Sequence, residues 1–223
     1  GEICRKAARR IYEGETEKIR VSGNNLEEFL GKPKYREDKK NKKDEIGIVR
    51  GLAWTSVGGV TLEIEVNVLP GKGELVLTGK LGDVMKESAR AGISYIRSIS
   101  SDYGIDPEFF TKHDIHVHIP EGAVPKDGPS AGITMALAIL SAITERPVRA
   151  DIAMTGEITI RGRVLPIGGL KEKLLAAKNA GMKTVCIPKD NERDLSELSE
   201  EITEGMEILP IDHMNQLIKA AFV

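Results

Sequence analysis

Apolar and polar residues alternate most regularly in residues 60–68. This period of two predicts a half-buried strand, and its apolar positions are Val60, Leu62, Ile64, Val66 and Val68. Turn residues follow at Pro70, Gly71 and Gly73. We expect residues 74–78 to return as the antiparallel partner of a hairpin.

Helical spacing begins at Leu81, where apolar residues recur every three or four positions as far as Ile99. Similar spacing predicts further helices over residues 129–144, 169–180 and 212–221. Residues 114–120, 184–188 and 206–209 read as strands, and residues 150–167 as a strand pair. Hairpins mixed with helices favour an α+β domain with an antiparallel or mixed sheet and about four to five helices, rather than a doubly wound parallel sheet.

The region before this domain divides into two parts. Residues 1–31 predict a helix, a short strand at 18–21 and a second helix that begins near Asn24 or Asn25 and ends at Gly31. This fragment is too small to form a core alone. Residues 32–45 are dense in charged side chains and predict a solvated linker. The main domain is therefore expected over residues 46–223.

The composition indicates a globular protein. Hydrophobic residues make up 40% of the 223 residues, and no apolar run reaches the roughly 20 residues that cross a bilayer. The first residues lack a secretory signal and an initiating methionine, which suggests a cut fragment. Cys4 and Cys186 are far apart and form no disulfide framework, so we expect a reducing cytoplasm.

The formal net charge of -2 gives no overall attraction to nucleic acid or to a membrane. A local exception is the basic part of residues 32–45, which would permit a weak DNA contact. Acidic residues at Glu37, Asp38 and Asp44 interrupt that run. The solvated linker is therefore the favoured interpretation, and a DNA-binding or assembly module is the competing class of function.

Ser130 is the candidate nucleophile. It follows Gly128 and Pro129 at the expected start of an apolar helix, where free backbone amides and the positive helix end lie near its hydroxyl. A serine in such a place often only caps the helix. Here Asp127 is a second candidate for the cap, which would leave the Ser130 hydroxyl free to react.

A serine needs a base to remove its proton, and Lys173, Lys171 and the histidines are candidates. Helical spacing places Lys173 on the same side as Leu170 and Ala177. Burial there would lower the pKa of the lysine toward the range of a general base. The alternative is a lysine whose stem packs while its amine reaches water.

Asp114, His116 and His118 share one face of a predicted strand, which offers a rival Ser-His-Asp arrangement. The two histidines lack a cysteine or carboxylate cluster of matching spacing, so we expect no metal site.

The segment from Gly73 to Leu81 superficially looks like a phosphate-binding loop, but five residues separate its glycines and Leu81 replaces Ser or Thr. We therefore expect no cofactor in this chain.

Three segments carry a family resemblance. Residues 125–132 read Pro-Lys-Asp-Gly-Pro-Ser-Ala-Gly, residues 155–159 read Thr-Gly-Glu-Ile-Thr, and residues 168–173 read Gly-Gly-Leu-Lys-Glu-Lys. Together they resemble the signature segments of Lon proteases, and the resemblance extends over residues 46–223. Residues 1–31 resemble the end of the small helical subdomain of the AAA+ ATPase in that family.

The resemblance implies an ATP-dependent serine endopeptidase with a Ser-Lys dyad. On matching positions, Ser130 is the nucleophile, Lys173 is the base and Thr155 orients the lysine amine, while backbone amides from Asp127 to Ser130, including Gly128, bind the oxyanion. The histidines are not catalytic on this reading. The family also implies a homohexamer that degrades unfolded polypeptides, with ATP and Mg bound by an ATPase module that this chain lacks.

Overall fold

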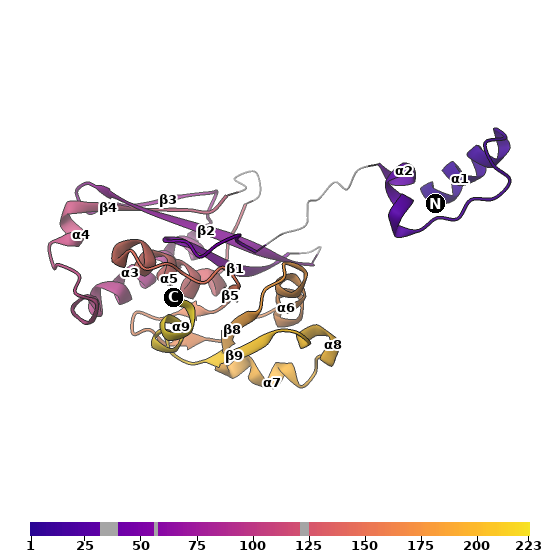
Figure 1. The fold of residues 1–223 in the computed structure, drawn as a ribbon. Helices are drawn as coiled ribbons and strands as arrows, with labels where there is room; N and C mark the ends of the chain where they lie inside the picture. The colour runs from indigo at the N-terminus through magenta and orange to yellow at the C-terminus, as the bar shows by residue number, and fades with distance from the viewer. Residues whose placement is uncertain (32–39, 56–57, 121–124) are drawn as a thin grey trace. The chain divides into compact units, whose positions relative to one another are not determined.

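The computed structural model describes residues 1–31, 40–55, 58–120 and 125–223 (Figure 1). Its contacts divide the chain into two units, Gly1–Glu37 and Asp38–Val223. Most of the predicted linker, residues 32–39, lies outside the described residues. The domain boundaries and the assignment of the first unit to an ATPase subdomain stay predictions.

The first unit contains α1 (Glu2–Tyr12), the 3-10 turn η1 (Gly23–Asn25) and α2 (Leu26–Leu30). Phe29 is its buried side chain, and the Arg10 guanidinium lies 4.9 Å from the centre of that ring. Arg10 also pairs with Glu28 at 2.9 Å. The strand predicted at residues 18–21 is wrong, because residues 1–31, the described part of this unit, contain no neighbouring strand to complete a ladder.

The second unit is a mixed α and β structure, which confirms the predicted α+β class. Its strands are β1 (Ile48–Thr55), β2 (Gly58–Pro70), β3 (Leu75–Thr78), β4 (His113–His118), β5 (Ile152–Met154), β6 (Glu157–Ile158), β7 (Val164–Leu165), β8 (Thr184–Pro188) and β9 (Glu207–Ile211). Its α-helices are α3 (Asp83–Ser98), α4 (Phe109–Lys112), α5 (Gly132–Thr144), α6 (Leu170–Asn179), α7 (Glu192–Leu195), α8 (Glu200–Thr203) and α9 (Met214–Ala221). The 3-10 turns are η2 (Ser100–Tyr103), η3 (Pro129–Ala131) and η4 (Lys189–Asn191).

The long helices α3, α5, α6 and α9 lie where helical spacing predicts them. The other α-helices of the second unit, α4, α7 and α8, have four residues each. One turn is too short to show a periodic apolar pattern, so the prediction omitted them.

Seven strands form one sheet in the order β3-β4-β2-β1-β5-β8-β9. Strand β2 pairs antiparallel with β1 and β4, while the remaining neighbours are parallel. The alternation in β2 is confirmed, since Leu62, Ile64 and Val66 are buried in the main core. Strands β6 and β7 form a separate antiparallel pair, so only part of the predicted 150–167 segment joins the main sheet.

The predicted hairpin between β2 and β3 is wrong. Strand β3 pairs parallel with β4, which lies between β3 and β2. The reason lies in the turn, because the Asp114 carboxylate accepts the backbone N–H groups of Lys72, Gly73 and Glu74 at 2.8, 3.0 and 2.8 Å. These bonds hold the turn across the start of β4 and carry the chain to the far side of that strand.

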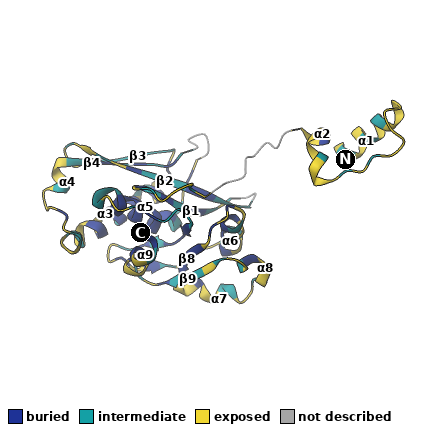
Figure 2. Ribbon diagram, viewed as in Figure 1, coloured by how far each residue is buried: buried dark blue, intermediate teal, exposed yellow. Residues whose placement is uncertain are grey.

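Helices cover both faces of the centre of the sheet (Figure 1). Helix α5 is buried from Gly132 to Ser141, as the dark blue ribbon in Figure 2 shows, and packs between α3 and strands β1 and β2. Helix α6 packs on the opposite face. Val49 of β1 belongs to the cluster around α5 and Leu52 to the cluster around α6, as alternate faces of one strand require.

Candidate active site

Ser130 lies in the 3-10 turn η3, directly before α5. Its carbonyl oxygen accepts the Gly156 N–H at 2.8 Å and the Thr155 hydroxyl at 3.4 Å. The segment that follows β5 therefore fixes the backbone of the serine. The Ser130 side chain is partly exposed, and in the described part of the chain its hydroxyl makes no hydrogen bond.

Lys173 lies on α6 with an exposed fraction of 3%. Leu170, Leu174 and Ala177 of the same helix are buried with it, so the inward orientation predicted from helical spacing is correct. Burial lowers the pKa of the Lys173 amine to about 8, because the charged form is poorly solvated there. Lys171, two residues earlier, is exposed.

No hydrogen bond or ion pair of the Lys173 amine occurs among the described residues, and none joins it to Ser130 or Thr155. Thr155 itself is fully buried, and its N–H donates to the Cys186 carbonyl at 3.1 Å. In this structure its hydroxyl holds Ser130 rather than the lysine. Helix α6 packs on β1 and β2, and η3 also contacts β1. Strand β1 therefore links the elements that carry Lys173 and Ser130, but the hydrogen bonds of a dyad are not formed among the described residues.

Asp127 has a different role from the predicted cap of α5. Its Oδ1 accepts the Met85 N–H at 3.0 Å, in the first turn of α3. The residue before that helix is Gly82, which has no side chain to offer as a cap. A Cβ added at Gly82 would lie 2.2 Å from Asp127 Cγ, so the glycine makes room for the carboxylate. Asp127 is thus the cap of α3, supplied from a distant part of the sequence.

The same Asp127 oxygen accepts the Gly128 N–H at 2.8 Å. Gly128 has a φ of 120°, a backbone conformation that favours glycine. Its amide, one of the predicted oxyanion donors, is therefore occupied in this structure. The Ser130 amide lies in the first turn of η3, where amides lack partners within the helix.

His116 and His118 of β4 both interact with Thr78 of β3. The Thr78 hydroxyl lies 2.9 Å from His116 Nε2 and 2.7 Å from His118 Nδ1. Asp114 holds the turn before β3. The geometry therefore gives the rival Ser-His-Asp arrangement no support. Within the described ranges, no group of three or more His, Cys, Asp or Glu side chains is placed to hold a metal ion.

Cys186 lies in β8 and is fully buried, which raises the pKa of its thiol to about 12. The reactive thiolate is therefore scarce at neutral pH.

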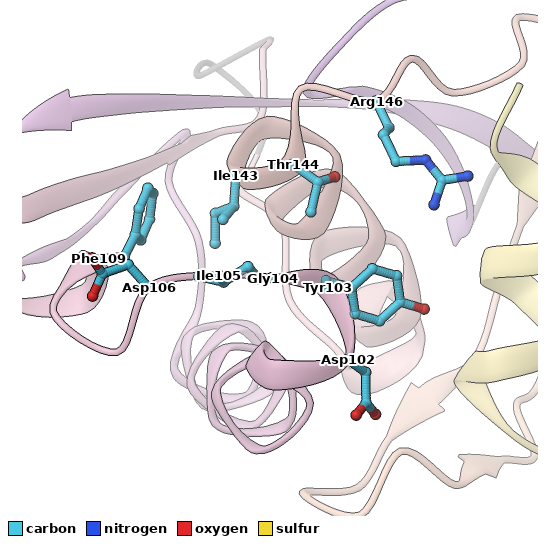
Figure 3. Close-up of a pocket in the computed structure, with 9 residues that line it drawn as sticks. All are labelled: Asp102, Tyr103, Gly104, Ile105, Asp106, Phe109, Ile143, Thr144 and Arg146. Carbon is cyan, nitrogen blue, oxygen red and sulfur yellow. The ribbon is translucent and has the colours of Figure 1, made fainter.

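A pocket of about 580 Å³ lies away from these groups (Figure 3). The pocket is lined by residues of η2 and the loop that follows it, by Phe109 at the start of α4, by the end of α5 and by Arg146 just beyond it. Tyr103 is among the lining residues of η2. Burial raises the pKa of the Tyr103 hydroxyl, and the Arg146 guanidinium lies 4.4 Å from the centre of the Phe222 ring. The pocket shares no residue with the Ser130 and Lys173 site.

Comparison with known proteins points to one family. Residues 20–223 match the model of the Lon protease (S16) C-terminal proteolytic domain. The chain is 66% identical over 206 residues to a Lon protease of Lachnoclostridium phytofermentans, covering 92% of this chain and 26% of the relative. It is 60% identical to a Lon protease of Clostridioides difficile, covering 100% and 28%, and 55% identical to Lon protease 1 of Bacillus subtilis, covering 99% and 29%.

The chain therefore spans between a quarter and a third of the length of these relatives. In the part of the chain that the structure describes, no helix is both long and apolar enough to span a membrane.

Proposed function

Because the chain belongs to the family of Lon protease (S16) C-terminal proteolytic domains, we propose that it is the peptidase part of a serine endopeptidase. Its substrates are unfolded or misfolded polypeptides. The observation that carries the proposal is Lys173, a buried lysine whose pKa is lowered to about 8. It lies on α6, which packs on β1, and β1 also contacts the turn η3 that carries Ser130. Such an amine is partly neutral near pH 7 and can accept a proton.

In the proposed mechanism, the neutral Lys173 amine accepts the Ser130 proton as the serine oxygen attacks the carbonyl carbon of the peptide bond. Backbone amides at η3 stabilise the negative oxygen of the tetrahedral intermediate. The protonated lysine then gives its proton to the leaving amine. Water hydrolyses the acyl-enzyme with the same lysine as the base.

The mechanism requires Ser130 and Lys173 to meet, since no hydrogen bond joins them in the structure. Hydrogen bonds of catalytic groups are often long before substrate binds and tighten in the complex. Thr155 is the link that we propose between them, because it already contacts the serine backbone and its hydroxyl can accept an N–H of the lysine. Release of the Gly128 amide from Asp127 would add a second oxyanion donor beside Ser130.

We also propose that ATP and Mg act outside this chain. The Gly73 to Leu81 segment does not match a phosphate-binding loop, since it lacks the spacing and the Ser or Thr of that motif. Unfolding driven by ATP would be supplied by another part of a longer protein, and assembly as a homohexamer would enclose the proteolytic sites. We propose that this protein acts in the cytoplasm.

Cleavage of a disordered protein without ATP tests the proposal. We expect the chain to cleave it, and we expect Ser130→Ala and Lys173→Ala to lose cleavage while Lys171→Ala and His118→Ala keep it. The assay is repeated over a range of protein concentrations. Activity that appears only at high concentration indicates that the chain must assemble, whereas no activity at any concentration indicates that it does not hydrolyse peptide bonds. Cleavage that survives Lys173→Ala but is lost in His118→Ala would contradict the dyad.

A further inference from the structure

Thr134, in the first turn of α5, has an unusual environment. Its exposed fraction is 0%, and its hydroxyl oxygen is the buried side-chain atom without a hydrogen-bond partner among the described residues. A buried hydroxyl without a partner destabilises the folded state, and most such groups in proteins are paired. This exception lies four residues after Ser130.

That spacing matters because a threonine in a helix reaches back to the carbonyl four residues earlier. For Thr134 this is the carbonyl of Ser130. The Thr134 side chain also lies against Gly51 of β1, where an added Cβ would be 3.0 Å from the hydroxyl oxygen. Gly51 pairs with Met154, the residue before Thr155. Thr134 therefore lies four residues after Ser130 and against β1, which pairs with β5 just before Thr155.

The Ser130 carbonyl is already occupied in this structure. It accepts the Gly156 N–H at 2.8 Å and the Thr155 hydroxyl at 3.4 Å, which uses both of its lone pairs. The Thr155 bond is at the long limit of a hydrogen bond. If the Thr155 hydroxyl turned toward Lys173, this bond would break. The Ser130 carbonyl would then be a free acceptor four residues before Thr134, the position to which a helical threonine can donate.

We propose that Thr134 is a positioning residue for the reaction of Ser130. When the Thr155 hydroxyl turns to Lys173, the Thr134 hydroxyl donates to the Ser130 carbonyl and keeps the serine in place. The Thr134 hydroxyl has no partner among the residues that the structure describes because its hydrogen bond to the Ser130 carbonyl forms only when Ser130 and Lys173 meet. This inference rests on the proposed function, because it assigns Thr134 to the same nucleophile.

The test compares Thr134→Val, which removes the hydroxyl but keeps the shape, with Thr134→Ser, which keeps the hydroxyl. The matched control is Thr144→Val on the same helix, since the Thr144 hydroxyl already donates to the Leu140 carbonyl at 2.7 Å. Hydrolysis of an unstructured peptide gives kcat and KM, and thermal unfolding gives Tm. Ser130→Ala is measured beside them.

We expect Thr134→Val to lower kcat about tenfold, the effect of one hydrogen bond, with unchanged KM and an equal or higher Tm. Thr134→Ser should stay within about twofold of the parent kcat, and Thr144→Val should lower Tm without changing kcat. A Thr134→Val kcat within about twofold of the parent would overturn the inference. So would a loss that Thr134→Ser does not restore or that accompanies a lower Tm. Ser130→Ala with full activity, or a parent chain without hydrolysis that depends on Ser130, would instead contradict the proposed function.

Discussion

Gly59 of β2 and Glu172 of α6 lie so close that a Cβ added at Gly59 would be 1.9 Å from the Glu172 carbonyl oxygen. Contacts this short do not occur between real atoms, so any larger residue at position 59 has to push the helix away. Lys173 follows Glu172 directly, and its backbone nitrogen would lie 3.1 Å from the same added Cβ. We therefore expect the burial of Lys173, and with it the lowered pKa of its amine, to depend on this close approach.

Gly59→Ala should therefore lower peptidase activity by displacing α6 from the sheet. A displaced helix exposes the Lys173 amine to water, which returns its pKa toward the ordinary value and reduces the neutral fraction at pH 7. Gly168→Ala is the matched control, because a Cβ at Gly168 meets no atom within 4 Å. Equal activity of the two variants, with both folded by circular dichroism, would show that the close approach does not matter.

The pH dependence of activity should follow Lys173. Its amine must be neutral to act as a base, so kcat/KM should rise about tenfold per pH unit below pH 8 and level off above it. The measurement is kcat/KM for one peptide between pH 6 and 9.5. A rate that does not change across this range would contradict a lysine base.

The burial of Lys173 should also make the free energy of unfolding depend on pH. The pKa of Lys173 is about 8 in the folded state and about 10.4 in the unfolded chain. Between these values the unfolded chain binds more protons, so the free energy of unfolding rises with pH, by about 1.4 kcal/mol per unit. Lys173→Met should remove this rise and be more stable than the parent below pH 8, as urea unfolding at pH 7 and 9.5 measures.

Asp127→Ala should destabilise α3, because it removes the oxygen that accepts the Met85 N–H. We expect a loss of about 1 kcal/mol, typical of an N-terminal cap. Asp83→Ala is the control, since Asp83 lies in the same first turn but is exposed, and its side chain forms an ion pair with Lys86 on the surface. Urea unfolding that gives equal losses for both variants would indicate a general charge effect instead of a cap.

Asp114→Ala should weaken the turn before β3. The N–H groups of Glu74, Lys72 and Gly73 hold the pKa of the Asp114 carboxyl below its usual value. Because the folded pKa is lowered, the stabilisation is present above the unfolded pKa of about 3.9 and is lost as the pH falls through the folded value. The difference in Tm between parent and Asp114→Ala should therefore shrink in acid. A difference that stays constant down to pH 2 would contradict this account.

The sequence predicts an element correctly where the pattern that defines it lies within that element. Strand β2 and the long helices bury one face, so their periods are visible. Strand β1 lies between β2 and β5 and is covered by α5 on one face and α6 on the other. Its buried residues Val49, Gly51 and Leu52 therefore fall on both faces and give no alternation. The predicted hairpin failed because Asp114, about 40 residues after the turn, decides where the chain goes.

In the candidate site, too, features set within one element could be predicted and features set by distant contacts could not. The inward orientation of the Lys173 side chain follows from helical spacing within α6. The sequence makes Asp127 a candidate cap for the helix that follows it, but its partner Met85 lies 42 residues earlier, and no local pattern contains that contact. Thr155 entered only through the family resemblance, because a single threonine after a short strand has no distinguishing signal.

The central claim, that Lys173 activates Ser130, is tested most directly by trapping the acyl-enzyme. The chain is incubated with a peptide ester and quenched in acid, and mass spectrometry of the digest locates the acyl group. We predict an acyl group on Ser130 in the parent and in Lys171→Ala, and its loss in Lys173→Ala and Ser130→Ala. Acylation of another residue, or Ser130 acylated equally in Lys173→Ala, would contradict the account.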